Sequence, residues 1–113
     1  MALSRGDLVT IAVQGDYGKP RPAVVVQADA FLGLKSIMVL PLTSDANADA
    51  DLFRVVVSPD KENGLRLVSV VMVDKAMPVP VEKLGAVFGR MSRKTMRDID
   101  RRIVSFFGVG SIA

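Results

Sequence analysis

The residues best suited to chemistry in this sequence are polar side chains at the ends of apolar runs. They are Arg21, Thr43, Ser44, Asp74 and Lys75. Because strand ends can meet at one mouth of a small barrel, these side chains are candidates for a shared site. Each also has a local interpretation, as a surface ion pair, a turn or a backbone cap, and spacing alone leaves both interpretations open.

Arg21 is the most constrained of these residues. It stands between Pro20 and Pro22 in KPRPAVVVQ, residues 19–27. Proline fixes its own φ, and a residue before proline is pushed into extended conformations. The chain therefore presents Arg21 stiffly at the start of a buried run of valines.

The sequence contains no histidine and no cysteine. Histidine is the commonest general base near neutral pH, and thiolates supply nucleophiles and zinc ligands. Catalysis must therefore rely on Arg, Lys, Asp, Glu, Ser, Thr or Tyr. No Gly-rich phosphate or dinucleotide motif is present, and we expect no cofactor and no metal. The acidic loop with Asp45, Asp49 and Asp51 is interpreted as a hydrated loop, with a divalent-cation site as the alternative.

The 113 residues, half of them apolar, suit one domain spanning residues 1–113. No apolar run approaches the roughly 18 residues that span a bilayer, and no signal peptide is recognisable. We therefore expect a soluble, cytoplasmic protein. The net charge is +3, and from Arg90 onward six residues are basic and two acidic. That pattern predicts either a polyanionic partner or an ordinary solvated helix face.

Short runs rich in β-branched residues, separated by turn-forming clusters, predict at least five strands. They are residues 7–13, 23–27, 36–42, 52–57 and 67–73. Residues 28–35 predict one helical turn, 43–51 an exposed loop and 58–64 a turn. Pro78 and Pro80 limit their segment to an edge or a crossover, and residues 81–88 are ambiguous.

The C-terminal segment predicts an amphipathic helix, because Ser92 can cap its start and Gly108 can end it. Its apolar face comprises Met96, Ile99, Ile103 and Phe106. The predicted fold is mainly β, a small curved antiparallel barrel or sheet closed by this C-terminal helix.

Four segments occur in a fixed order: RGDLV near the start, KPRPAVVVQ, VLPLTS and NGLRLVSVVMVDK. Together they resemble the MazF/PemK (Kid-like) toxins of bacterial type II toxin–antitoxin modules, over residues 4–107. The resemblance implies a dimeric, SH3-like and CcdB-like β-barrel. It also implies a toxin that cleaves single-stranded RNA without a metal and is neutralised by a small, acidic cognate antitoxin.

The resemblance also implies roles for individual residues. The catalytic arginine and threonine of the family match Arg21 and Thr43, and Asp74 matches an acidic residue with base or RNA-binding roles. Further RNA contacts are implied at Lys19, Ser44, Ser69 and Lys75.

The reaction implied by the family suits this composition. The 2′-hydroxyl of RNA attacks the adjacent phosphate and leaves a 2′,3′-cyclic phosphate and a 5′-hydroxyl, so the protein need not supply a nucleophile. Because arginine keeps its proton, Arg21 is better suited to stabilise the phosphorane charge than to act as a base. The base is then Asp74 or no single residue, and the Thr43 hydroxyl can donate to a phosphate oxygen.

The sequence departs from the family pattern in two places. The loop at residues 14–20 is shorter than in many members, and Met72 stands where some members carry an arginine proposed as general acid. Lys19 and Lys75 are the candidates to replace that arginine. Two alternative functions are a CcdB-like gyrase poison, whose C-terminal Trp-Gly-Ile is missing here, and a non-catalytic SH3-like interaction module.

Overall fold

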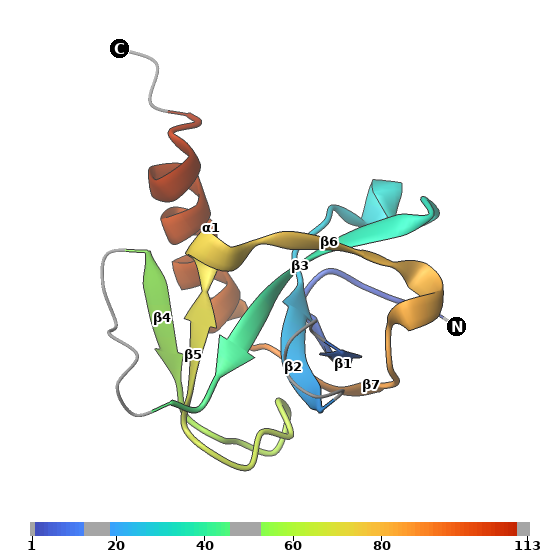
Figure 1. Cartoon of the computed structure of the whole chain (residues 1–113). Helices are drawn as coiled ribbons and strands as arrows, with labels where there is room; N and C mark the ends of the chain where they lie inside the picture. The colour runs from blue at the N-terminus through green and yellow to red at the C-terminus, as the bar shows by residue number, and fades with distance from the viewer. Residues whose placement is uncertain (1, 13–18, 46–52, 111–113) are drawn as a thin grey trace.

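The computed structural model describes residues 2–12, 19–45 and 53–110. Within these ranges the chain forms a curled antiparallel sheet with one α-helix at its C-terminal end (Figure 1). The strands are β1 (Asp7–Ala12), β2 (Pro20–Val25), β3 (Ser36–Thr43), β4 (Arg54–Val57), β5 (Ser69–Met72), β6 (Met77–Pro80) and β7 (Val87–Arg90). The helices are α1 (Arg93–Phe107) and the short 3-10 turns η1 (Asp29–Phe31), η2 (Val73–Lys75) and η3 (Val81–Lys83). The predicted mainly β fold is confirmed.

The sheet curls because β3 changes partners along its length. The strands of the sheet follow the order β4-β5-β3-β2-β1-β7, and β6 pairs with β3 outside this path. The first part of β3 pairs with β6 and β2, whereas Leu42 and Thr43 pair with Val71 and Val70 of β5. The end of β3 therefore leaves β2 and opens the sheet at the point where β2 begins.

The three central strands are apolar on both faces because both faces are covered. Leu8, Val24 and Leu40 belong to one buried cluster, which Ile99 of α1 completes. The intervening residues of the same strands, such as Val9, belong to a second cluster that includes Val79 of β6. Burial on both sides explains why these strands read as continuous apolar runs without alternation.

Several strand boundaries differ from the prediction. The strand β2 begins at Pro20, three residues early, and its pairing with β3 covers only Ala23 to Val25. The prolines therefore lie where β2 has β1 alone as its partner, and no pairing with β3 is lost there. The strand β5 begins at Ser69, because Leu67 lies in the exposed loop before it.

The strand with Pro78 and Pro80 is β6, and β3 is its one partner within the described ranges, as expected for an edge. Residues 81–88 split into η3 and the start of β7. The predicted strand ends Val13 and Leu52 lie outside the described residues.

The predicted C-terminal helix is confirmed. The Ser92 side chain accepts a hydrogen bond from the Thr95 backbone N–H at 3.1 Å, and Gly108 ends the helix at φ +70°. Of the predicted apolar face, Ile99 is fully buried, whereas Phe106 is 45% exposed. The last turns of α1 extend beyond the sheet (Figure 1). There the ring of Phe106 packs against the ring of Phe53, with the two ring centroids 5.5 Å apart. None of the helices described here is long and apolar enough to span a bilayer.

Candidate functional site

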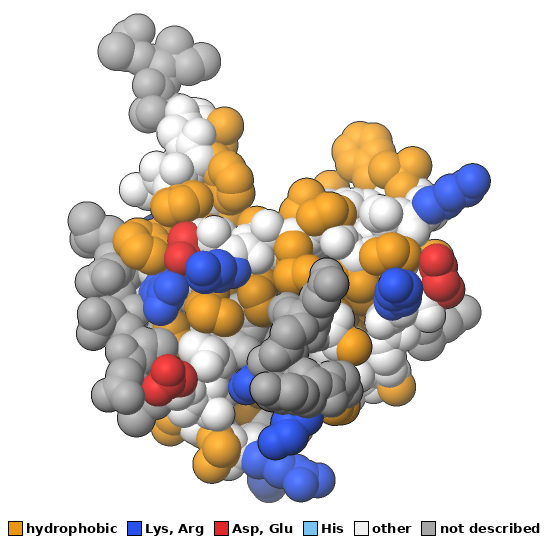
Figure 2. Space-filling view, in the orientation of Figure 1, with side chains coloured by type: hydrophobic (Ala, Val, Ile, Leu, Met, Phe, Trp, Pro, Cys, Tyr) orange, Lys and Arg blue, Asp and Glu red, His pale blue; other side chains and the backbone are white. Residues whose placement is uncertain are grey.

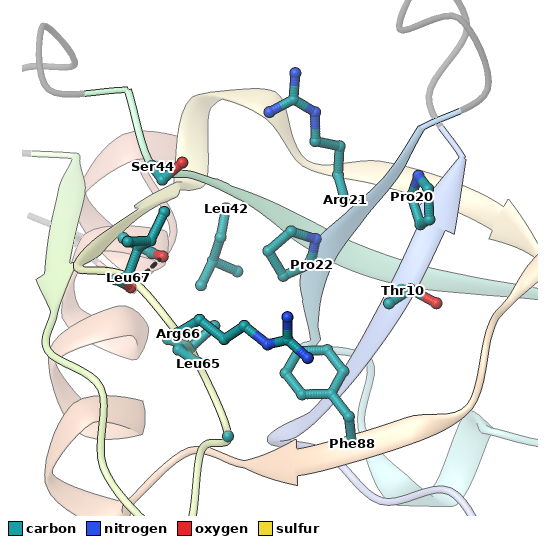
Figure 3. Close-up of a pocket in the computed structure, with 12 residues that line it drawn as sticks. Thr10, Pro20, Arg21, Pro22, Leu42, Ser44, Leu65, Arg66, Leu67 and Phe88 are labelled. Carbon is teal, nitrogen blue, oxygen red and sulfur yellow. Dashed lines mark hydrogen bonds between the residues drawn. The ribbon is translucent and has the colours of Figure 1, made fainter.

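An open groove of about 600 Å³ lies where β2 begins and β3 ends (Figure 3). Adjacent antiparallel strands run in opposite directions, so the start of one and the end of the other occupy the same end of the sheet. The groove is lined by β1, β2, β3, β7 and the loop before β5. Its polar side chains are Thr10, Arg21, Ser44, Arg66 and Ser69. This volume is typical of ligand-binding pockets.

The sequence-predicted pair Arg21 and Thr43 occupies this end of the sheet. Arg21 lines the groove from β2 and extends to its rim in Figure 3. Thr43 is the last residue of β3 and lies between two lining residues, Leu42 and Ser44. The Thr43 Oγ1 accepts a hydrogen bond from the Asp45 backbone N–H at 3.1 Å, which fixes the oxygen and leaves the hydroxyl hydrogen for another acceptor.

The other predicted contacts near the groove differ in accessibility. Ser44 is exposed at its edge. Ser69 lines the groove but is only 4% exposed, and its hydroxyl donates to the Leu67 carbonyl at 2.9 Å. This hydrogen bond ties Ser69 to the loop that precedes β5. Lys19 is exposed directly before β2 and is not among the lining residues.

Asp74 and Lys75 lie in η2, away from the groove. Asp74 lines a second cavity of about 350 Å³ beside the end of α1. Arg54 donates to its two carboxylate oxygens at 3.2 and 3.1 Å, and both side chains are 19% exposed. The hydrogen bonds from Arg54 and its positive charge lower the pKa of Asp74, against the opposing effect of burial. Lys75 is exposed in the same turn.

Met72 replaces the arginine of the family pattern, but an arginine of the neighbouring strand lies beside Asp74. Met72 of β5 pairs in register with Arg54 of β4, and the Arg54 guanidinium reaches Asp74 from that side. An arginine beside the aspartate is therefore present, although it comes from a different strand than in the family pattern. It serves an ion pair outside the groove.

Arg66 and Phe88 are among the groove residues that the sequence analysis did not single out. Arg66 sits inside the quoted NGLRLVSVVMVDK segment, whereas Phe88 fell in the ambiguous stretch at residues 81–88. Among the lining residues that the structure describes, none is a carboxylate. With Arg21 and Arg66 as its charged residues, the groove favours an anionic ligand.

The loop that carries Arg66 is held by an internal network around Asn63, which is 1% exposed. The Asn63 Oδ1 accepts from the backbone N–H groups of Asp60 and Leu65 at 3.0 and 2.9 Å, and its Nδ2 donates to the Ser58 carbonyl at 3.0 Å. The Asp60 carboxylate in turn accepts from the Asn63 backbone N–H at 2.7 Å. The predicted turn at residues 58–64 is confirmed, and its network makes it a fixed support for the groove.

The possible cation site in the acidic loop receives no support from the described part of the chain. In that part no three Asp or Glu side chains gather in a way that could hold a metal ion. Asp49 and Asp51 lie outside the described residues.

Comparison with known proteins places these features in a family. Residues 4–107 match the family described as PemK-like, MazF-like toxin of type II toxin-antitoxin system, and the chain belongs to this family. A relative from Mycolicibacterium smegmatis, named "Probable endoribonuclease MazF", is 38% identical over 108 residues, which are 95% of this chain and 98% of that protein.

Solved structures agree with the fold. An endoribonuclease in complex with its cognate antitoxin from a mycobacterial species has a TM-score of 0.80 at 19% identity, covering 98% of this chain and 100% of the other. The Mycobacterium tuberculosis toxin MazF-mt6 has a TM-score of 0.73 at 25% identity, with 88% and 95% covered. MazF from Deinococcus radiodurans has a TM-score of 0.75 at 20% identity, with 96% and 99% covered. The SH3-like and CcdB-like barrel expected from the sequence is the fold of these toxins.

Proposed function

We propose that this chain is the toxin of a type II toxin–antitoxin module and cuts single-stranded RNA in the groove between β2 and β3. Family membership and the 38% identical endoribonuclease support the class of reaction. The observation that carries the proposal is the placement of Arg21 at the rim of a groove whose described lining residues include Arg66 and no carboxylate, at the end of the sheet where Thr43 ends β3.

The proposed cleavage is a transesterification within the RNA. The 2′-hydroxyl oxygen attacks the adjacent phosphorus, the bond from phosphorus to the 5′ oxygen breaks, and the products carry a 2′,3′-cyclic phosphate and a 5′-hydroxyl. Arg21 donates to the non-bridging oxygens, whose negative charge increases in the transition state. The Thr43 hydroxyl donates to the same phosphate. The attacking group belongs to the RNA, so the reaction is expected to proceed in EDTA.

Proton transfer is not assigned to Asp74. A general base works best with a pKa near the operating pH, and the pKa of Asp74 is lowered by Arg54. Asp74 also lines the second cavity, not the groove. We therefore propose that the 2′-hydroxyl proton passes to water, that water supplies the proton taken up by the leaving 5′ oxygen, and that Asp74 and Arg54 together fix β4 against η2.

The test is Arg21→Ala assayed on a long, weakly structured RNA in EDTA, with end-group analysis of the products. One lost transition-state donor of this kind costs about 10²- to 10³-fold in rate. Arg21→Lys keeps the charge without the planar fork and is expected to recover only part of the rate. Lys35→Ala is the matched control, because Lys35 is exposed just before β3, at the end of that strand opposite Thr43. Full cleavage by a folded Arg21→Ala protein contradicts the assignment, and a wild-type protein that cleaves no RNA favours the non-catalytic interaction module.

The proposal includes the partners expected of such a toxin, which acts in the cytoplasm. One structural relative is an endoribonuclease bound to its cognate antitoxin, and we propose a small acidic antitoxin for this chain as well. We also propose a homodimer. Phe106, Phe107 and Val104 of α1 are exposed, and the first two line the second cavity together with Met38 of β3. Figure 2 shows hydrophobic side chains along α1 and near β6, an apolar surface that a second copy can cover.

A further inference from the structure

Phe88 of β7 is an aromatic side chain that lines the groove. Phe88 is 37% exposed, although a phenyl ring has no polar group that water can satisfy. In Figure 3 its ring lies in the groove together with Pro22 and Thr10, below the rim at which Arg21 stands. An exposed ring in a positively charged groove is the arrangement by which proteins stack single-stranded nucleic acid bases.

The backbone that holds Phe88 is packed against the Asn63 loop. The Arg90 backbone N–H donates to the Glu62 carbonyl at 2.8 Å. A Cβ added at Gly89 would overlap the Asn63 carbonyl oxygen, so the two backbones touch there. A Cβ at Gly64 would lie 2.8 Å from the Phe88 carbonyl oxygen. The strand that carries Phe88 and the loop that carries Arg66 are therefore fixed relative to each other.

Arg66 is the second element of this arrangement. It is exposed and lines the groove, and no hydrogen bond or ion pair joins it to another of the described residues. In Figure 3 its side chain extends along the groove toward the Phe88 ring. A guanidinium that lines the same groove as an exposed ring and is open to solvent can contact the phosphate that follows a stacked base.

We propose that Phe88 and Arg66 form a nucleotide-binding subsite next to Arg21, in which the Phe88 ring stacks on one unpaired base and Arg66 contacts an adjoining phosphate. This inference rests on the proposed cleavage of single-stranded RNA in the same groove. Stacking accepts every base, so the subsite fixes the register of the strand relative to Arg21 and adds affinity without selecting a sequence.

A purely structural role for Phe88 predicts a different behaviour. Its ring lies near Gly64, so it also packs against the loop. If packing were its only role, a Phe88→Leu variant would bind all RNAs equally less well or not change at all. If the ring stacks on a base, the loss must depend on whether that base is present.

The test is a cycle between the Phe88→Leu substitution and removal of single bases from a short RNA. The RNA carries a 2′-deoxy nucleotide at the cleavage position, so binding is measured without cutting. Wild-type protein is expected to lose about 5- to 150-fold in affinity when one particular position near the cut is abasic. Phe88→Leu is expected to lose a similar factor on the intact RNA and nothing more on that abasic RNA, and Phe88→Trp is expected to keep the affinity. Equal losses from Phe88→Leu on every RNA of the series would overturn the proposal.

Arg66 is tested by salt dependence. Each phosphate contact to a single strand adds about 0.7 to the slope of log affinity against log salt. Arg66→Gln is therefore expected to reduce the slope by about 0.7, whereas Phe88→Leu leaves it unchanged. Lys35→Gln is the matched control for the lost charge and is expected to retain the slope. An unchanged slope in Arg66→Gln overturns the phosphate contact.

These results are separable from the proposed function. Wild-type cleavage of the all-ribose RNA is measured in parallel. Absence of cleavage counts against the endoribonuclease proposal, whereas normal cleavage with an unaltered Phe88→Leu binding profile counts against the subsite alone. Thermal unfolding of each variant identifies any that fail to fold. If Phe88→Leu is one of them, Phe88→Trp is compared with the wild type on the same RNA series.

Discussion

Replacing Asn63 by alanine tests whether the loop network holds the groove in place. The substitution removes three hydrogen bonds of a side chain that is 1% exposed: two accepted from the Asp60 and Leu65 N–H groups and one donated to the Ser58 carbonyl. Each such bond contributes about 0.5 to 1.5 kcal/mol net. Ser58 and Asp60 are exposed, so water can satisfy part of what is lost.

The expected loss in the free energy of unfolding is therefore about 2 to 4 kcal/mol. For a chain of this length that corresponds to a fall in Tm of roughly 8 to 16 °C. Urea denaturation followed by circular dichroism measures the first quantity and calorimetry the second. Lys61→Ala is the matched control, because Lys61 is an exposed neighbour in the same loop and is expected to change stability by less than about 0.5 kcal/mol.

The same variant is expected to weaken RNA binding at temperatures where it is still folded, because Arg66 directly follows Leu65, whose backbone N–H the network holds. A loss of less than about 1 kcal/mol in the free energy of unfolding would show that the three Asn63 hydrogen bonds do not stabilise the loop as argued. Normal RNA affinity in a clearly destabilised but folded Asn63→Ala protein would refute the link between the loop and the groove.

Two further predictions concern the second cavity. Because the pKa of Asp74 is lower in the folded protein than its ordinary value of 3.8, its contribution to stability is present above that value and is lost as the pH falls through the lowered pKa. Asp74→Asn is therefore expected to cost about 1 to 3 kcal/mol at neutral pH, with its unfolding curve converging on that of the wild type in strong acid; parallel curves at every pH would contradict this. For the homodimer, light scattering is expected to give twice the chain mass for wild type and Lys94→Glu, and the mass of one chain for Phe107→Glu, whose ring is 52% exposed. A wild-type monomer at high micromolar concentration would exclude the dimer.

Much of the fold could be predicted from local patterns. The runs around Val24 and Leu40 had to be buried strands, and Ser92 with Gly108 bounded the helix, because caps and apolar periodicity act over a few residues. The features that could not be predicted depend on partners distant in sequence. Pro20 joins β2 because β3 does not pair with it there, and Phe106 is exposed because α1 extends beyond the sheet.

For the site, the sequence by itself determined the available chemistry. With no histidine and no cysteine, catalysis is left to Arg, Lys, Asp, Glu, Ser, Thr or Tyr, and Arg21 stands fixed between two prolines. Only the tertiary structure decided which polar residues share a groove. In the folded chain Asp74 pairs with Arg54 of β4 and lies outside the groove. Arg66 and Phe88, which are 22 positions apart in the sequence, both line the groove. The physical reason is that strand register and the backbone contact at Gly89 are set by packing across the sheet, which no local pattern contains.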